Sequence, residues 1–173
     1  SIIKENYKQI VSVTTVGFDI FVTESLLPLV NGMEIVLADE GQANLQTSLN
    51  SLLSGHQADV IQTTPTKMKA LIIDKKQTEY LRGIKAIILG GEALDKALVD
   101  DLYKLTSAEI FNIYGPTETT VWSTNTKIVD IEDITIGKPI ANTQIYILDK
   151  YLNPTPIGVT GELCIAGDGV DRK

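Results

Sequence analysis

The sequence predicts an α/β fold in which a parallel sheet flanked by helices is followed by part of an antiparallel β-subdomain. Short β-branched runs alternate with amphipathic stretches through the first hundred or so residues, and such alternation is typical of parallel sheets covered on both faces. Beyond Tyr114 the helical stripes disappear and short extended runs take over. We therefore expect a soft boundary near residue 125, which divides the chain into residues 1–125 and 126–173.

The first part carries the expected strands and helices in strict alternation. The strands are runs rich in valine and isoleucine, and they lie at residues 9–14, 33–38, 58–62, 84–89 and 108–112. The helices carry apolar residues at helical spacing, and they lie at residues 19–29, 45–55, 65–72 and 94–105. Pro65 suits the first turn of its helix, where a missing N–H costs little.

The second part is expected to consist of short strands and turns. Its apolar runs lie at residues 121–122, 134–136, 144–148 and 162–165. Turn sequences such as Gly137-Lys138-Pro139 and Gly167-Asp168-Gly169 separate them, which favours antiparallel pairing.

Composition excludes several classes of protein. The chain has 173 residues, 43% of them hydrophobic, and a formal charge of −7 from 15 basic and 22 acidic side chains. An acidic surface repels phosphate backbones, so we expect no nucleic acid partner. No run approaches the ~20 apolar residues that cross a bilayer, and no signal-peptide pattern opens the sequence. We therefore expect a cytoplasmic protein with no membrane partner.

The single cysteine and the single histidine argue against two kinds of chemistry. Cys164 has no partner for an internal disulfide and cannot form a cysteine-based metal cluster. A Ser–His–Asp triad would need His56, but no Gly-x-Ser-x-Gly elbow occurs. We expect His56 to be a solvated residue beside Gly55 at a helix end.

Two glycine-bearing segments follow the last two strands of the expected parallel sheet, where ligands of open α/β sheets bind. Residues 90–93, Gly-Gly-Glu-Ala, are compatible with an ordinary turn. Residues 112–120 combine groups that suit a nucleotide with its metal. The Asn112 amide suits a purine edge, the Tyr114 ring offers a stacking face, and Glu118 offers a hard oxygen ligand for Mg²⁺.

These residues give the sequence a resemblance to a known family. One stretch closely resembles the adenine- and phosphate-binding motif of adenylate-forming enzymes, in the form typical of nonribosomal peptide synthetase adenylation domains; it reads Asn112-Ile113-Tyr114-Gly115-Pro116-Thr117-Glu118-Thr119-Thr120. Phe18-Asp19 with Glu24 resembles the segment that begins the family's amino-acid pocket. Residues 161–170 resemble its Gly-Glu-Leu strand motif. The motifs occur in the family's order and span nearly the whole chain.

The resemblance implies a flavodoxin-like sheet and an enzyme that activates an amino acid with ATP and Mg²⁺. The products would be an aminoacyl-adenylate and pyrophosphate, and the phosphopantetheine thiol of a carrier protein would then take the acyl group. By the same resemblance, Asn112 contacts the adenine and Tyr114 stacks on it. Thr117 meets the phosphates and Glu118 holds Mg²⁺, which makes these two the catalytic residues. The backbone of Gly91, Glu92 and Ala93 would line the adenine slot.

The resemblance also implies a pocket for the amino-acid substrate. Its positions are Asp19, Ile20, Thr23, Gln62, Ile88, Gly90, Ile113 and Val121. Alone, Asp19 could be a helix cap, but the resemblance makes it the carboxylate that pairs with the substrate's α-ammonium, and we favour that role. We expect a medium-sized substrate side chain with a hydrogen-bonding end, such as Asn or Gln, because Gln62 brings an amide to apolar walls.

Several parts of the family's site are expected outside this sequence. The phosphate loop would precede Ser1, and the ribose-binding acid, the hinge and the catalytic lysine would follow Lys173. We therefore expect an internal piece of the large amino-terminal core of an adenylation domain. Its partners would be the remainder of that domain and, in the parent protein, carrier-protein and condensation domains. The piece alone should be inactive, because the missing groups supply charge stabilisation.

Two other functions stay open. One is a fragment of an acyl-CoA or aryl-acid ligase of the same superfamily, which would differ at the position of Asp19. The other is a non-catalytic nucleotide-binding module of flavodoxin-like shape. The Tyr-Gly-Pro-Thr-Glu sequence and Asp19 favour the amino-acid branch.

Overall fold

The computed structural model describes residues 2–39, 41 and 46–171, and within them most strands form one large sheet. Seven strands pair in the order β2-β1-β3-β4-β5-β6-β7. The first five are parallel: β1 (Gln9–Ser12), β2 (Glu34–Leu37), β3 (Val60–Thr63), β4 (Ala86–Gly90) and β5 (Glu109–Tyr114). The order 2-1-3-4-5 is that of flavodoxin-like sheets. The predicted α/β class and parallel sheet are therefore confirmed.

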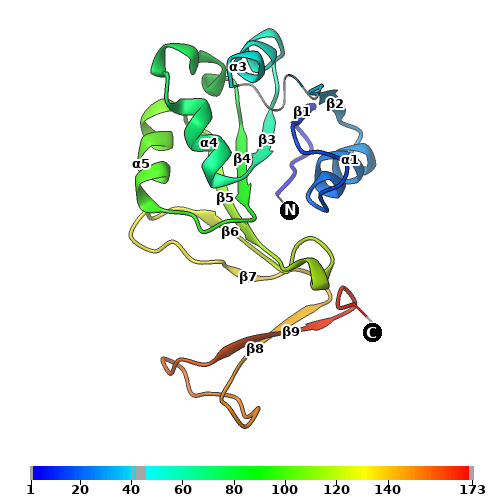
Figure 1. Cartoon of the computed structure of the whole chain (residues 1–173), viewed down its shortest axis with the longest axis vertical. Coiled ribbons are helices and arrows are strands. Elements are labelled where there is room, and N and C mark those ends of the chain that lie inside the picture. The colour runs from blue at the N-terminus through cyan, green and yellow to red at the C-terminus, as the bar shows by residue number, and fades with distance from the viewer. Residues whose placement is uncertain (1, 40, 42–45, 172–173) are drawn as a thin grey trace.

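The remaining strands are antiparallel. β6 (Thr124–Ile128) pairs with β5, and β7 (Lys138–Pro139) pairs with β6, so both extend the large sheet. β8 (Thr143–Leu148) and β9 (Glu162–Gly167) form a separate two-stranded sheet, the orange and red arm in Figure 1. The division expected near residue 125 falls within β6, while the separate arm begins at Thr143.

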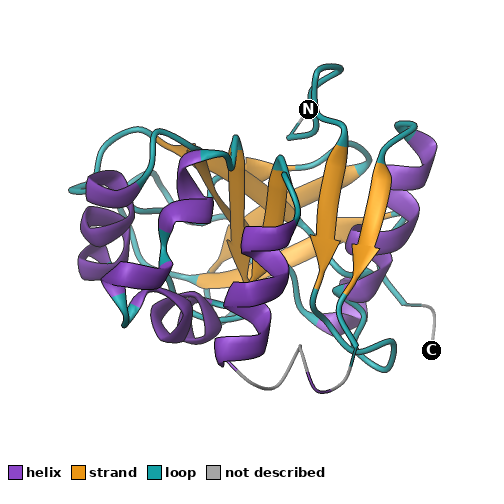
Figure 2. Ribbon diagram, turned by 90° about the horizontal axis from the view of Figure 1, so that it is seen from above, coloured by secondary structure: helices purple, strands orange, loops and turns teal. Residues whose placement is uncertain are grey.

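Helices cover both faces of the large sheet (Figure 2). They are α1 (Phe21–Val30), α3 (Gln46–Gly55), α4 (Pro65–Ile72) and α5 (Lys96–Leu105). Each lies where the sequence predicts a helix; Leu45 of the second prediction is outside the described residues. The caps of α4 and α5 are side chains that follow strand ends: Thr64 accepts the Lys67 N–H at 3.3 Å, and Asp95 accepts the Leu98 N–H at 2.9 Å. None of the helices described is long and apolar enough to span a bilayer.

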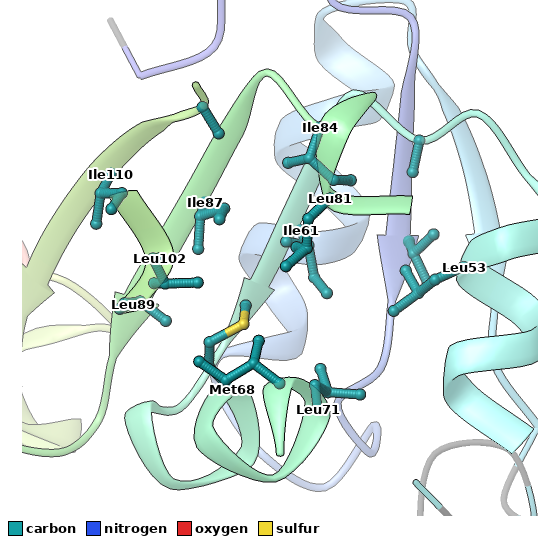
Figure 3. Packing of buried hydrophobic residues seen from close by; sticks show 14 of the residues in the cluster. Leu53, Ile61, Met68, Leu71, Leu81, Ile84, Ile87, Leu89, Leu102 and Ile110 are labelled. Carbon is teal, nitrogen blue, oxygen red and sulfur yellow. The ribbon is translucent and has the colours of Figure 1, made fainter. Parts of the chain in front are cut away.

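Two hydrophobic clusters fill the two faces. Strand residues such as Ile61, Ile87 and Ile110 pack against α3, α4 and α5, as Figure 3 shows. The residues between them face the other cluster, which includes Ile88 and Ile113. Burying each such side chain contributes about 1.5–3 kcal/mol. Because neighbours along a strand face opposite sides, Asn112 and Ile113 of β5 serve different faces of the sheet.

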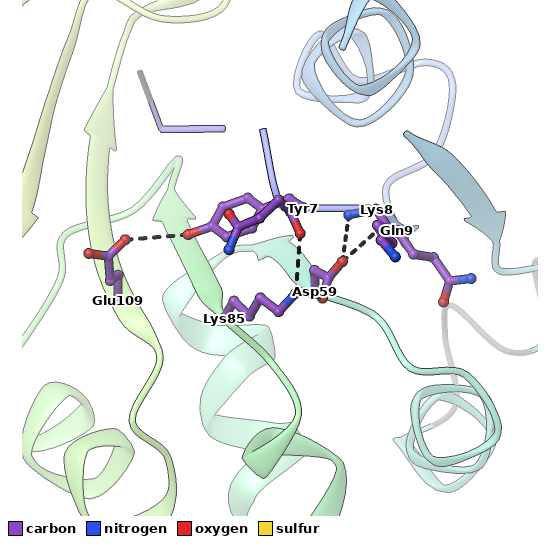
Figure 4. A network of polar contacts seen from close by, with 7 residues as sticks. Tyr7, Lys8, Gln9, Asp59, Lys85 and Glu109 are labelled. Atoms are coloured by element: carbon purple, nitrogen blue, oxygen red, sulfur yellow. Dashed lines mark hydrogen bonds and ion pairs between the residues drawn. The ribbon is translucent and has the colours of Figure 1, made fainter. Parts of the chain in front are cut away.

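Charged groups join the strands at the amino edge of the sheet (Figure 4). The Asp59 carboxylate accepts the backbone N–H groups of Lys8 and Gln9 at 2.5 and 3.2 Å and pairs with Lys85 at 2.7 Å. Glu109 pairs with Lys127 at 2.6 Å and with Lys4 at 2.5 Å. Hydrogen bonds from these two lysines lower the pKa of Glu109 to about 2. This network lies at the end of the strands opposite to the cavities described below.

Two predicted strands are absent from the structure. Thr120 and Val121 have φ of 58° and 69°, left-handed values that interrupt an extended chain, so β6 begins only at Thr124. Residues 134–136 form a loop between β6 and β7 without strand pairing. Asn112 donates to the carbonyl of Thr135 at 2.7 Å, which fixes this loop beside β5.

Candidate functional site

Two cavities lie at the carboxyl edge of β4 and β5, and Ile113 lines both. The first cavity has a volume of about 480 Å³ and is lined by residues 91–94, 112–115 and 134–136. The second cavity has a volume of about 270 Å³ and lies on the face that α1 covers. The predicted adenine residues thus gather around the first cavity, and four predicted pocket residues, Thr23, Gln62, Ile88 and Ile113, line the second.

Asn112 presents only one end of its amide to the first cavity. Its side chain is buried, and Nδ2 is engaged by the Thr135 carbonyl. That neighbour is an oxygen, which fixes Nδ2 as the donor and leaves Oδ1 as the acceptor that remains. The half-buried Tyr114 and the apolar Ile134 and Ile136 complete the walls on this side. This side of the cavity therefore offers apolar surface and the Asn112 Oδ1 acceptor.

The loop after β4 forms the opposite wall of the first cavity. Gly91 has φ of +80°, a left-handed value that favours glycine. A Cβ on Gly91 would lie 3.4 Å from Ile20 Cδ1, so the turn that carries Asp19 and Ile20 contacts this wall. The Glu92 carboxylate accepts the Thr66 N–H at 2.9 Å. Burial raises the pKa of Glu92, but hydrogen bonds from Thr66 and Thr64 and the charge of Lys69 outweigh it, so the net pKa is lowered.

Thr117 and Glu118 lie on a short 3₁₀ turn, Thr117–Thr119, and both side chains are exposed. The segment after β9 holds this turn. The Asp171 N–H donates to the Glu118 carbonyl at 2.8 Å, and the Thr120 hydroxyl donates to the Gly169 carbonyl at 2.7 Å. Neither Thr117 nor Glu118 is among the residues that line the first cavity. No cluster of three or more metal-ligating side chains occurs in the described part of the chain.

Two hydrogen bonds shape the second cavity. The Trp122 indole N–H donates to the Thr23 hydroxyl at 2.7 Å, which joins α1 to the segment before β6. Gln62 Nε2 donates to the Ile20 carbonyl at 3.3 Å, which joins β3 to the start of α1. The remaining walls include the apolar Leu27 and Ile140.

The other four predicted pocket residues, Asp19, Ile20, Gly90 and Val121, are not among the residues that line the second cavity. Ile20 is buried and Asp19 is half-buried, both just before α1. A Cβ on Gly90 would lie 2.5 Å from Ile113 and 2.7 Å from Trp122, so glycine is required there by close packing. Val121 is 9% exposed, and its carbonyl approaches Gly115 closely.

Glu24 is fully buried and ties α1 to the end of β1. Its carboxylate accepts the N–H groups of Val13 and Thr14 at 2.8 and 3.0 Å and the Ser12 hydroxyl at 2.8 Å. Lys67 of α4 donates to the Val13 carbonyl at 3.1 Å. Burial lowers the pKa of Lys67, and the nearby charge of Glu24 opposes that shift. The two side chains together set the start of the turn that carries Asp19.

Sequence reasoning missed several cavity residues. It did not assign Leu27, Trp122, Asn125, Ile134, Ile136 or Ile140 to either cavity. Asn125 lies directly opposite Ile113 in the β5–β6 pairing. A strand predicted at residues 124–128 would have placed Asn125 on the pocket face. The sequence pattern instead predicts an extended run at residues 121–122, where Val121 has left-handed backbone.

Comparisons relate the chain to known proteins. The profile of the AMP-binding enzyme family matches residues 3–172. The chain is 41% identical over 166 residues to a dimodular nonribosomal peptide synthase of Bacillus subtilis (strain 168), which covers 95% of this chain and 7% of that protein. It is 35% identical over 158 residues to tyrocidine synthase 3 of Brevibacillus parabrevis, with 90% of this chain and 2% of that protein covered.

A solved structure has the same fold. It is the four-domain nonribosomal peptide synthetase holo-AB3403, bound to AMP and glycine. The superposition has a TM-score of 0.85 at 38% sequence identity and covers 95% of this chain and 12% of that one. The chain therefore spans only a small part of each of these three proteins.

Proposed function

We propose, from the premise that this chain belongs to the AMP-binding enzyme family, that it is the substrate-selecting piece of an adenylation domain for amino acids. It is homologous to adenylate-forming ligases, and its relatives are multidomain nonribosomal peptide synthetases. One observation carries the proposal beyond the family: a cavity that suits an adenine and a cavity that suits a side chain share one wall, Ile113. Two substrates bound there would meet at the carboxyl edge of the sheet.

The first cavity is proposed as the adenine site. Asn112 Nδ2 donates to the Thr135 carbonyl, so Oδ1 would accept a hydrogen bond from the exocyclic amino group of adenine. The Tyr114 ring would stack on the base, against the backbone of Gly91 to Ala93. ATP would supply an α-phosphorus open to attack, with pyrophosphate as the leaving group.

Thr117 and Glu118 are proposed to serve the phosphates and Mg²⁺. Mg²⁺ is usually bound through one or two carboxylates together with substrate phosphates. A single exposed Glu118 on a turn held by the segment after β9 fits that pattern better than a preformed cluster would. Catalysis of this displacement rests on positioning and charge neutralisation rather than on covalent help.

Asp19 is proposed to pair with the α-ammonium of the amino acid. Its turn contacts Gly91 through Ile20, so the ammonium would bind beside the adenine wall, and the substrate side chain would enter the second cavity. An unpaired charge in such a site is costly, so Asp19 would discriminate amino acids from plain carboxylic acids. The activated acyl group would pass to the phosphopantetheine thiol of a carrier protein, next to a condensation domain in the parent.

The test is Asp19→Asn in the intact enzyme that contains this sequence, assayed by amino-acid-dependent ATP–pyrophosphate exchange. We expect kcat/KM for the amino acid to fall roughly 100-fold or more, because one partner of an ion pair is lost. Asp101→Asn, on α5 and lining neither cavity, should leave exchange unchanged. Normal exchange by Asp19→Asn would refute the ammonium role. Exchange driven equally by acids that lack an amino group would favour an acyl-CoA or aryl-acid ligase.

We also propose that this chain alone supports little or no exchange. Among the described residues, no lysine or arginine lines either cavity, so the phosphate charge of ATP would find no cationic partner there. The purified chain should give background exchange under conditions in which the intact enzyme is active. A robust signal from the chain alone would contradict this part of the proposal.

A further inference from the structure

We infer that the second cavity selects an uncharged amino-acid side chain that ends in a hydrogen-bond donor, which names Asn, Gln, Ser or Thr as the substrate class. The inference rests on the proposed function, because it assumes that the cavity receives the side chain of the amino acid. It is carried by an unpaired oxygen on Gln62, by the absence of charge from the described walls, and by the pairing of Trp122 with Thr23.

Gln62 lines the second cavity with an amide that is only half satisfied. The side chain is 1% exposed, and Nε2 is engaged by the Ile20 carbonyl. Because that neighbour is a carbonyl oxygen, the amide cannot be turned round without placing two acceptors together. Oε1 accepts no hydrogen bond in the structure. Leaving such a buried acceptor unpaired is unfavourable, and an occupant with an N–H or O–H would satisfy it.

The walls of the cavity exclude a charged occupant. They include Leu27, Ile88, Ile113, Trp122 and Ile140, and no Asp, Glu, Lys, Arg or His lines the cavity among the described residues. A carboxylate or ammonium group would be buried there without a partner, which is strongly unfavourable. An aliphatic side chain would suit the walls but would leave Gln62 Oε1 unpaired.

The other polar side chains of the cavity are Thr23, Trp122, Thr124 and Asn125, and the buried Thr124 hydroxyl, which has no hydrogen-bond partner, is a second group that a polar occupant would satisfy. The Trp122 N–H is already used by the Thr23 hydroxyl at 2.7 Å. Asn125 is half-buried and opposite Ile113, and paired residues of antiparallel strands share one face of the sheet. Its amide is therefore on the cavity side, where it can donate to a substrate oxygen. Gln62 and Asn125 together suit a terminal amide, which carries a donor and an acceptor.

The experiment compares matched substrates in the intact enzyme by ATP–pyrophosphate exchange. Each polar amino acid is paired with an apolar one of similar shape: Asn with Leu, Gln with Met, and Thr with Val. Asp and Glu test the effect of charge. We expect the best of Asn, Gln, Ser and Thr to exceed every apolar or acidic amino acid by at least about 10-fold in kcat/KM, because a buried polar group rejects substrates that leave it unpaired.

The variant Gln62→Met tests the origin of that preference. It keeps the length of the side chain and removes the acceptor, so the preference over the apolar counterpart should shrink to about 2-fold or less. Gln57→Met, on the exposed surface, is the matched control and should keep the wild-type preference. The wild-type comparison decides the matter even if Gln62→Met does not fold.

The outcomes separate this inference from the function on which it rests. Activation of Leu, Met or Val as well as the polar amino acids, or a preference for Asp or Glu, would overturn the inference and leave the adenylation function standing. A polar preference that persists in Gln62→Met would also overturn it. Exchange with no amino acid at all would overturn the proposed function and the inference together.

Discussion

Glu24 and Lys67 hold the same residue, Val13, from its two sides. The Glu24 carboxylate accepts the Val13 N–H at 2.8 Å, and the Lys67 ammonium donates to the Val13 carbonyl at 3.1 Å. The next residues form the turn that leads to Asp19. Contacts with α1 and α4 therefore fix the residue from which this segment starts.

Glu24→Ala should destabilise the chain by about 2–4 kcal/mol, because the buried N–H groups of Val13 and Thr14 lose their acceptor. Urea denaturation followed by circular dichroism measures the effect. Glu34→Ala, which removes an exposed carboxylate from β2, should change stability by less than about 0.5 kcal/mol. Equal effects of the two substitutions would show that the Glu24 contacts contribute little.

Gly90→Ala should lower the thermal stability clearly, because the new Cβ would lie 2.5 Å from Ile113 and 2.7 Å from Trp122. Overpacking of this kind costs typically about 1–3 kcal/mol. Gly55→Ala is the matched control, since nothing lies within 4 Å of its Cβ position, and it should be neutral or slightly stabilising. A Gly90→Ala protein that melts like wild type would mean that Ile113 and Trp122 can move apart freely.

Asn112→Ala should raise the KM for ATP in the intact enzyme by roughly 10-fold, with a smaller effect on the KM for the amino acid. The substitution removes the free Oδ1 and also releases the Thr135 carbonyl, so the wall formed by residues 134–136 loses its anchor. Asn6→Ala, at the amino edge of the sheet, is the control. If the KM for ATP stayed unchanged, the assignment of the first cavity to adenine would be wrong.

Acid should weaken the fold through Glu109. Hydrogen bonds from Lys127 and Lys4 lower its pKa from 4.5 to about 2, so its stabilising contribution is complete above pH 4.5 and is lost as the pH falls towards 2. Glu109→Gln does not titrate, so its melting temperature should fall less over this window than that of the wild type. Parallel melting curves for the two proteins between pH 5 and pH 2 would contradict the assignment.

The parallel half of the fold follows from the sequence because each of its elements carries its own pattern. Pro65 and the leucines of α5 mark helices locally, and β-branched runs such as that around Ile10 and Val11 mark buried strands. The same rules fail after Tyr114. Thr120 and Val121 adopt left-handed backbone that their residue types disfavour, so the start of β6 is imposed by tertiary contacts.

The candidate site, too, could be predicted only in part from the sequence. The resemblance identified Asn112 and Tyr114 of the first cavity because their motif is contiguous in sequence. It could not identify residues 134–136, which reach the first cavity only because Asn112 binds Thr135. Nor could it reveal that one end of the Gln62 amide is engaged by Ile20 and the other is left unpaired, since this depends on how α1 packs beside β3.

Ile113, as the common wall of both cavities, limits how substrate preference can be redesigned. Under the proposed function, trimming Ile113 to enlarge the second cavity would also deform a wall of the first cavity, so a wider range of amino acids would come with weaker nucleotide affinity. Thr23, Gln62 and Asn125 line only the second cavity. A library that varies these three positions and keeps Ile113 fixed should therefore yield altered amino-acid preference at nearly constant affinity for ATP.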